Sequence, residues 1–210
     1  MLSAVLLLAL QSKTLNYDIY RGSDLIGEAK ILIKITQDGG KRTDTKLTLK
    51  LSGKTLDMHT TQVWAFSGRP TLKIVQMFDA KGNETHRTRA DFKADEVSVM
   101  ETVGDKTTKK TVPIAADAEI RELSEFWFLR DEPVKDEAFK FQSFDASTQK
   151  WQTATSTYIG IESKVVDGKK MALYHVAQEI GTKKVDVWLD TDGFPLITES
   201  SDKTKIVAKF

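Results

Sequence analysis

The stretch that decides the fold is KILIKITQDGGKRTDTKLTLKL, residues 30 to 51. Two of its segments place a large aliphatic side chain at every second position. These alternating residues are Ile31, Ile33, Ile35, Leu47, Leu49 and Leu51. Because successive side chains of a strand point to opposite faces, the pattern predicts two strands with one buried face and one solvated face. The Asp38-Gly39-Gly40 turn between them predicts an antiparallel hairpin.

The same rhythm of strands and turns runs along most of the chain. Segments between the turns are rich in Thr, Val, Ile and aromatic residues, which suit a pleated, half-buried surface. The predicted turns lie at residues 22–24, 38–40, 52–54, 67–70, 81–83, 104–105, 167–168, 181–182 and 192–193. Their spacing predicts about a dozen strands, about eight in an N-terminal block and about five in a C-terminal block. We therefore expect an all-β, mainly antiparallel fold with a strongly curved sheet or a β-barrel.

Residues 113 to 133 interrupt this rhythm. Helix-favouring residues from Ala115 to Leu123, with Asp117 or Ser124 as possible caps, predict one short helix. The segment SEFWFLRDEP, residues 124 to 133, then places four large apolar side chains before a charged end and a proline. A continuous apolar run fits a segment that is buried on both sides. We expect this segment to form an aromatic plug against the curved sheet, with its charged end at the rim.

The N-terminal residues 1 to 12, MLSAVLLLALQS, hold a short apolar run. The run is far shorter than the roughly 20 residues that span a bilayer, and its length matches the apolar region of a secretory signal peptide. No Lys or Arg precedes it, and the alternative is a first core strand or helix. We expect a signal peptide over residues 1–12 and a single β-barrel or half-barrel domain over residues 13–210. The mature protein is then extracytoplasmic, either periplasmic or secreted, with no transmembrane span.

Charge and cysteine content exclude several classes of protein. The 31 basic and 30 acidic residues are interleaved along the chain, so we expect no nucleic-acid partner. The lysine-rich segment KTTKK, residues 106 to 110, is predicted to be a solvated edge strand. The absence of cysteine excludes disulfides, thiolate metal ligands, a cysteine nucleophile and a lipid-modified cysteine.

Motifs for catalysis, metals or cofactors are missing from the sequence. The three histidines, His59, His86 and His175, each stand alone in a strand-like stretch, so we expect no metal site. There is no Gly-x-Ser-x-Gly turn and no glycine-rich phosphate loop, so we expect no catalytic residue and no cofactor. Residues 190–193, Asp-Thr-Asp-Gly, resemble the start of a calcium loop but lack its later ligands, which favours a hairpin turn.

Aromatic residues are more numerous than a small sheet needs to cover one helix. Large β-barrels and strongly curved sheets can enclose an apolar ligand. The candidate ligand-binding residues are Trp64, Phe66, Phe126, Trp127 and Phe128. The alternative is that these rings only fill the core, and the sequence leaves both interpretations open.

Two stretches carry a resemblance to a known group of proteins. Residues 17–27, YDIYRGSDLIG, resemble the opening hairpin of exported bacterial proteins of unknown function, and residues 188–196, WLDTDGFPL, are similar to their closing hairpin. The strand succession of this family is also similar to that of the periplasmic LolA/LolB lipoprotein carriers. The resemblance implies an extracytoplasmic β-barrel or half-barrel with a helix or loop against its open side, and it carries over no catalytic residue. LolB-type proteins are anchored through a cysteine that this chain lacks, so only the comparison with the soluble carriers applies.

Three functions are compatible with the sequence. The first is non-catalytic binding of an apolar, lipid-like small molecule on the concave face of the sheet. The second is a structural or assembly role in the cell envelope, through contacts with an envelope protein. The third is a hydrolase whose site forms only in three dimensions, around His59, His86 or His175. The oligomeric state is left undetermined by the sequence.

Overall fold

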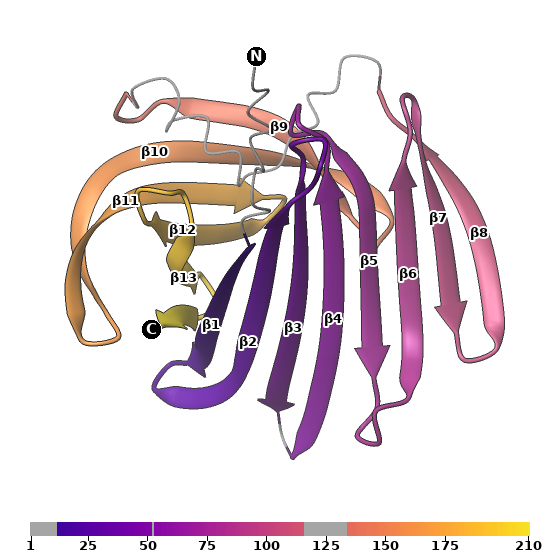
Figure 1. Ribbon diagram of the computed structural model, residues 1–210, viewed down its shortest axis with the longest axis horizontal. Coiled ribbons are helices and arrows are strands. Elements are labelled where there is room, and N and C mark those ends of the chain that lie inside the picture. Colours follow the sequence, from indigo (N-terminus) through magenta and orange to yellow (C-terminus); the bar gives the residue numbers. More distant parts are fainter. Residues whose placement is uncertain (1–11, 52, 116–133) are drawn as a thin grey trace, which may run out of the picture.

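The chain forms one continuous antiparallel sheet (Figure 1). The structure, a computed structural model, describes residues 12–51, 53–115 and 134–210. Its strands are β1 (Ser12–Arg21), β2 (Asp24–Ile35), β3 (Lys41–Leu51), β4 (Lys54–Trp64), β5 (Pro70–Phe78), β6 (Glu84–Phe92), β7 (Glu96–Val103), β8 (Lys106–Pro113), β9 (Ala138–Asp145), β10 (Lys150–Val166), β11 (Lys169–Ile180), β12 (Lys183–Leu189), β13 (Pro195–Ser200) and β14 (Thr204–Lys209). The predicted all-β, antiparallel fold class is confirmed.

The order of strands in the 14-stranded sheet follows the chain, with one exception. Consecutive strands pair from β1 to β8 and from β9 to β14, and β1 also pairs with β14, so the two ends of the described chain meet inside the sheet. The edge strands are β8 and β9. The solvated edge strand that was predicted for residues 106–110 is confirmed, because β8 lies at the edge and is exposed along most of its length.

The hairpin over residues 30–51 is present as predicted, with Ile31 opposite Thr45 and Ile33 opposite Thr43. The glycine-bearing turns that the sequence predicts also connect consecutive strands. Strand ends that the glycine pattern does not mark lie at residues 93–95, 146–149 and 201–203, where the chain turns without a glycine. Gln149 and Lys203 adopt positive φ there, which explains why turn chemistry alone predicts too few C-terminal strands.

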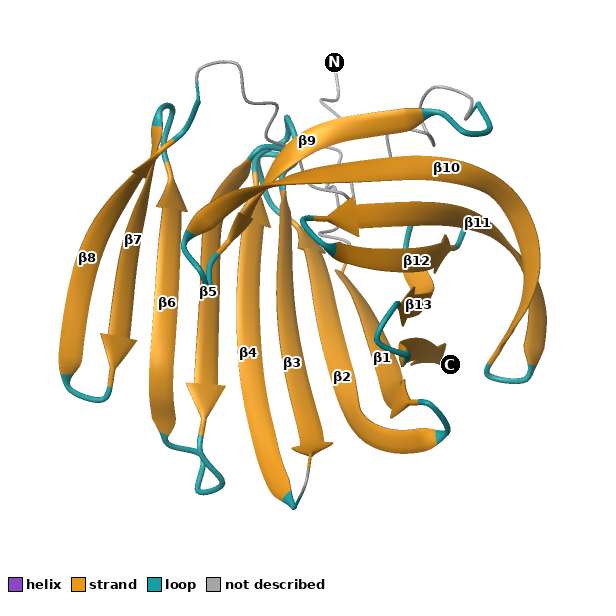
Figure 2. Cartoon of the chain, turned by 180° about the vertical axis from the view of Figure 1, so that it is seen from behind, coloured by secondary structure: helices purple, strands orange, loops and turns teal. Residues whose placement is uncertain are grey.

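The sheet curves so strongly that its two halves face each other. Figure 2 shows β9 to β12 running across one end of the β1–β8 half at a steep angle. The 17-residue strand β10 bends along its length, and its pairing with β11 shifts register between Tyr158 and Gly160. Gly160 has a φ of 142°, a conformation that side chains with a Cβ rarely adopt. This bulge therefore needs glycine and lets the long hairpin curl.

The interior holds a hydrophobic cluster that joins the two ends of the described chain. Leu15 and Tyr17 of β1 pack with Ala208 of β14, Trp188 of β12 and Leu173 of β11. Burial of such side chains stabilises the fold by about 1.5–3 kcal/mol for each large residue. The cluster places β1 and β2 against the C-terminal strands, and the groove described below lies beside it.

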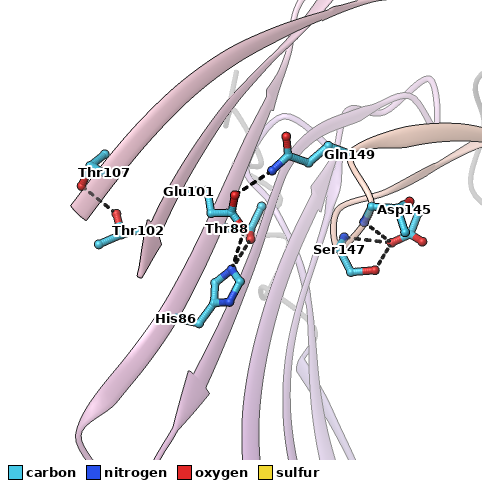
Figure 3. A network of polar contacts seen from close by, with 9 residues as sticks. His86, Thr88, Glu101, Thr102, Thr107, Asp145, Ser147 and Gln149 are labelled. Atoms are coloured by element: carbon cyan, nitrogen blue, oxygen red, sulfur yellow. Dashed lines mark hydrogen bonds and ion pairs between the residues drawn. The ribbon is translucent and has the colours of Figure 1, made fainter. Parts of the chain in front are cut away.

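Side chains, rather than strand pairing, connect the two edges of the sheet. The Trp151 indole of β10 packs edge-on against Phe92 of β6 and Phe144 of β9. Figure 3 shows the polar part of this junction, where Gln149 donates a 3.0 Å hydrogen bond to the Glu101 carboxylate of β7. Closure through side chains makes the sheet barrel-like without a continuous ring of backbone hydrogen bonds between the described strands.

The predicted short helix and aromatic plug fall within residues 116–133 and lie outside the described residues. The predicted signal peptide, residues 1–12, lies outside them as well, apart from Ser12, where β1 begins. Within the described ranges, no helix is long and apolar enough to cross a membrane.

Candidate functional site

A groove on the inner face of the N-terminal strands is the best candidate for a binding site. It has a volume of about 360 Å³ and lies between β1–β4 and the turn that joins β12 to β13. Its lining residues, which define the β1–β4 groove, are Leu15, Tyr17, Ile31, Ile33, Ile35, Lys41, Thr43, Thr45, Gln62, Asp192, Gly193, Phe194 and Pro195. Sites for small molecules are typically mostly apolar clefts with a few polar groups, and this lining has that character.

The register of the hairpins determines which side chains line the groove. Leu15 of β1 lies opposite Ile31 of β2, which lies opposite Thr45 of β3. Directly opposed residues share a face of the sheet, so these side chains form one row. A second row runs from Ile33 through Thr43 to Gln62 of β4. In both rows the side chain on β2 is apolar and those on β3 and β4 are polar.

The β12–β13 turn covers one side of the groove and is held in place by hydrogen bonds. The Asp190 Oδ1 atom accepts hydrogen bonds from the backbone N–H groups of Asp192, at 3.0 Å, and Phe194, at 2.8 Å. The Tyr17 hydroxyl donates a 2.9 Å hydrogen bond to the Pro195 carbonyl oxygen, which ties the turn to β1. Residues 190–193 form a hairpin turn, as the sequence favours, rather than a calcium loop.

Burial and a nearby carboxylate keep the Tyr17 hydroxyl neutral. The ring lies in the core cluster, and this burial, followed by the charge of Asp190, raises the pKa of Tyr17 well above its usual value. The hydroxyl therefore acts as a permanent donor to Pro195 at physiological pH. Its part in the groove is to position the β12–β13 turn.

Lys13 forms ion pairs with the acidic residues of the β12–β13 turn. Its ammonium lies 3.3 Å from an Asp190 carboxylate oxygen, 4.0 Å from one of Asp192, and 3.7 Å from the Phe194 ring centroid. Lys13 also lies opposite Ile33 across the β1–β2 pair. One cation is thus shared between two carboxylates at this end of the groove.

The predicted ligand-binding residues are not gathered at this groove. The Trp64 side chain is only 3% exposed, and it lies opposite Lys41, whose ammonium is 4.7 Å from the Trp64 ring centroid. Phe66 is 81% exposed. It lies in the β4–β5 turn, beside Gly39 of the β2–β3 turn. Residues 126–128 lie outside the described residues. Trp64 is therefore a buried contact of Lys41 and does not itself line the groove.

Sequence reasoning missed the groove because its residues have ordinary roles in a sheet. The alternation of Ile31 and Ile33 is visible in the sequence, but it predicts a buried face and not an accessible one. Only the cross-strand register places threonines and Lys41 beside these isoleucines. A search for hydrophobic strands whose hairpin partners are polar on the same face could have indicated this site.

A second polar cluster surrounds His175 on β10, β11 and β12. The His175 Nδ1 atom lies 2.8 Å from Glu162 Oε1, and Nε2 lies 2.8 Å from Asp186 Oδ1. The imidazole stacks on Trp188, with ring centroids 4.5 Å apart. Both carboxylate contacts are hydrogen bonds only when both ring nitrogens carry a proton. The cluster joins three strands through charge and stacking.

Glu162 is the centre of this cluster. Hydrogen bonds from Lys164 and then from Trp188, with a further contribution from His175, lower the pKa of Glu162 from 4.5 to about 2. Lys164 lies 3.0 Å from Oε2, and the Trp188 indole donates to the same oxygen at 3.0 Å. Glu162 is therefore a constant anion at neutral pH.

With the residues that the structure describes, the three histidines do not form a nucleophile–base pair suited to hydrolysis. His86 Nε2 contacts both the Thr88 hydroxyl, at 3.1 Å, and the Glu101 carboxylate, at 3.0 Å (Figure 3). In a catalytic triad the acid and the nucleophile bind different ring nitrogens, and Thr88 is only 3% exposed. His175 contacts two acids, and His59 packs against the Phe78 ring.

Metal ligands are also not brought together in the described part of the chain. No group of three or more histidine, aspartate or glutamate side chains there could hold a metal ion. The β1–β4 groove, with a volume of about 360 Å³, is of a size suited to a small molecule.

The fold and the groove together define an all-β protein with a single strongly curved, barrel-like sheet. A crystal structure described as a β-barrel-like protein of domain of unknown function DUF1849, from Brucella abortus, is similar, with a TM-score of 0.66. The similarity covers 94% of this chain and 94% of that chain, at 12% sequence identity. No family model matches the sequence, and no curated protein matches it.

At this identity the similarity shows the fold alone. It supports the expectation of a β-barrel-like protein of uncharacterised function and gives no sign of catalysis. The resemblance to the LolA/LolB carriers, the signal peptide and export stay predictions.

Proposed function

We propose that this protein is an extracytoplasmic, non-catalytic binding protein that holds an apolar, lipid-like ligand in the β1–β4 groove. The observation that carries the proposal is the partly exposed apolar lining of Ile31, Ile33 and Ile35 along a groove of about 360 Å³, beside Phe194 of the covering turn. Apolar side chains that line an accessible groove favour an apolar occupant, because binding removes their surface from water.

The envelope-assembly alternative has weaker support. Its most suitable surface is the β8 edge, which is exposed along most of its length. However, Lys106, Lys109 and Lys110 lie on that edge, and edge lysines oppose the addition of another strand. Ligand binding in the groove is therefore the better-supported function.

A fluorescence titration with the neutral apolar probe N-phenylnaphthylamine tests the proposal. The wild-type protein should bind the probe saturably. The Thr45→Trp variant places a large side chain in the groove on a strand position that suits aromatic residues, and it should weaken binding about tenfold or more. A matched control is Thr55→Trp, at an exposed position opposite Lys50 and away from the groove; it should bind as the wild type does.

Two results would contradict the proposal. One is the absence of saturable probe binding by a folded wild-type protein. The other is equal binding by Thr45→Trp and the wild type, since the probe would then occupy another place. Fractionation of cells that express the full chain tests the extracytoplasmic part separately, and recovery of the protein only in the cytoplasm would contradict it.

A further inference from the structure

We infer that the β1–β4 groove takes a single-chain amphiphile with an uncharged head group, whose carbonyl and hydroxyl groups bind to Thr43, Thr45 and Gln62. The inference rests on the proposed function and specifies the class of ligand. It comes from these three polar side chains of the groove, which have no hydrogen-bond partner within the described part of the chain.

The three polar side chains lie together on β3 and β4. Thr43 lies opposite Gln62 across the β3–β4 pair, and Thr45 is two positions further along β3, so all three share one face of the sheet. Each is only partly exposed. On the other side, Thr43 lies opposite Ile33 and Thr45 lies opposite Ile31. A ligand that lies across the strands therefore meets hydrocarbon on β2 and hydrogen-bonding groups on β3 and β4.

The other polar side chains of the groove already have partners. The Tyr17 hydroxyl donates to the β12–β13 turn, and the Asp192 carboxylate lies 4.0 Å from the Lys13 ammonium. The Lys41 ammonium lies 4.7 Å from the Trp64 ring centroid and has a further interaction. Among the polar side chains of the lining, the groups without a described partner are therefore the two threonine hydroxyls and the glutamine amide.

These three groups favour an uncharged head. A hydroxyl and a side-chain amide each offer both a donor and an acceptor. An ionised carboxylate only accepts and an ammonium only donates, so either would leave part of this capacity unused, and it would lose hydration beside uncharged groups. An ester or amide that carries a free hydroxyl provides a donor and acceptors together. The shared chemistry of the head is therefore that of a glycerol monoester or a hydroxylated amide.

The size of the groove favours one hydrocarbon chain. Its volume of about 360 Å³ lies near the lower end of the range for small-molecule sites, roughly 300–1,000 Å³. A lipid with two acyl chains would leave one chain largely in water, which costs free energy for every exposed methylene group.

Calorimetric titration with ligands of one chain length tests the inference. The series comprises monododecanoylglycerol, N-dodecanoylethanolamine, methyl dodecanoate, dodecanoate and dodecylammonium, with didodecanoylglycerol as the two-chain lipid. We expect one or both uncharged ligands with a hydroxyl to bind about five- to tenfold more tightly than methyl dodecanoate, which has no donor. The charged and two-chain ligands should also bind more weakly. A preference between the glycerol ester and the ethanolamide identifies which head group the site selects.

Substitutions on β3 locate the head group. Thr43→Val and Thr45→Val each remove a hydroxyl and keep a residue type that suits a strand. Together they should weaken binding of the preferred uncharged ligand about tenfold and retain binding of N-phenylnaphthylamine. The control Thr14→Val removes an exposed hydroxyl from β1, opposite Leu32 and outside the groove lining, and should change neither affinity. If the double variant does not fold, the two single variants provide the test, each with a loss of about threefold.

The outcomes separate the two proposals. If N-phenylnaphthylamine binds in the groove but a charged amphiphile binds as tightly as the uncharged ligands, the head-group inference is overturned while apolar binding stands. Unchanged affinity of the threonine variants for the preferred ligand overturns the placement of the head on β3. Tighter binding of the two-chain lipid overturns the single-chain assignment. If no probe or amphiphile binds to the folded protein, the proposed function is wrong and this inference with it.

Discussion

The Trp151 indole Nε1 donates a 3.0 Å hydrogen bond to the Pro113 carbonyl oxygen, so a side chain of β10 is bonded to the last residue of β8. The bond joins the two ends of a sheet whose edge strands, β8 and β9, are not paired with each other. The Lys73 ammonium adds a longer contact, 3.5 Å, to the Phe144 carbonyl oxygen. Closure of the described sheet thus depends on a small number of side chains.

Replacement of Trp151 should weaken this closure. Trp151→Ala removes the hydrogen bond and the edge-on packing against Phe92 and Phe144, and should reduce the free energy of unfolding by about 2–3 kcal/mol. Trp151→Phe keeps most of the packing and should cost about 1 kcal/mol. Urea unfolding measures both values, and hydrogen exchange should accelerate in β8 before it accelerates in β1. Phe66→Ala, at an exposed aromatic residue, is the control and should change stability by less than about 0.5 kcal/mol.

Gly27 should tolerate no side chain. A Cβ atom at this position would lie 2.2 Å from the Thr48 carbonyl oxygen, and this backbone atom cannot move without disturbing the β2–β3 pair. Gly27→Ala should therefore lower the free energy of unfolding by about 2 kcal/mol or more. Gly53→Ala is the comparison, because a Cβ there meets open space and the cost is the positive φ alone, about 1 kcal/mol. Equal losses in the two variants, measured by thermal or urea unfolding, would contradict the close approach at Gly27.

Acidification should destabilise the protein partly through Glu162. Its folded-state pKa is about 2, below the usual 4.5, so its contribution is fully present above pH 4.5 and is lost as the pH falls toward about 2. The side chain is 38% exposed, so solvent screening reduces this contribution to about 1 kcal/mol. Glu162→Gln should be less stable at pH 7 and should lose less stability across that window. Urea unfolding at a series of pH values measures the free energy of unfolding of both proteins. If this free energy changes with pH equally in the two, Glu162 is not a source of the pH dependence.

Tyr17→Phe should loosen the turn that covers the groove. The variant keeps the buried ring but removes the 2.9 Å hydrogen bond to the Pro195 carbonyl oxygen, which should cost about 1 kcal/mol of stability. Binding of N-phenylnaphthylamine should weaken a few-fold, because the Phe194 side of the groove is then held less firmly. Tyr20→Phe removes a longer contact, 3.4 Å to Asp18, away from the groove; its effect on probe binding should be negligible.

Local rules were sufficient to predict most of the fold. The alternation around Ile31 and Ile33 and the glycine turns predict antiparallel hairpins, and the structure confirms them. Turns without glycine, such as the one before Lys203, escape such rules because positive φ at other residues has no reliable sequence pattern. The curvature of the sheet and the β1–β14 pair escape them too, since both arise from contacts between distant segments.

The candidate binding site was harder to predict than the fold. Aromatic residues attract attention in a sequence, yet Trp64 is buried beside Lys41 and Phe66 faces solvent. Whether an apolar strand face is sealed or open depends on what covers it, here the β12–β13 turn held by Tyr17 and Lys13. Those contacts link residues more than a hundred positions apart, so no local pattern contains them.

The pairing of β1 with β14 has a consequence for folding speed. Among the strand pairs that the structure describes, every other pair joins neighbours in sequence, and this one requires the two ends of the sheet-forming chain to meet. Non-local pairing of this kind slows folding, because loop-closure entropy is lost before the contacts form. A circular permutant that links residue 210 to residue 12 and opens the chain between β8 and β9 would make every described strand pair local. Such a protein should keep the same sheet and fold faster than the natural connection allows.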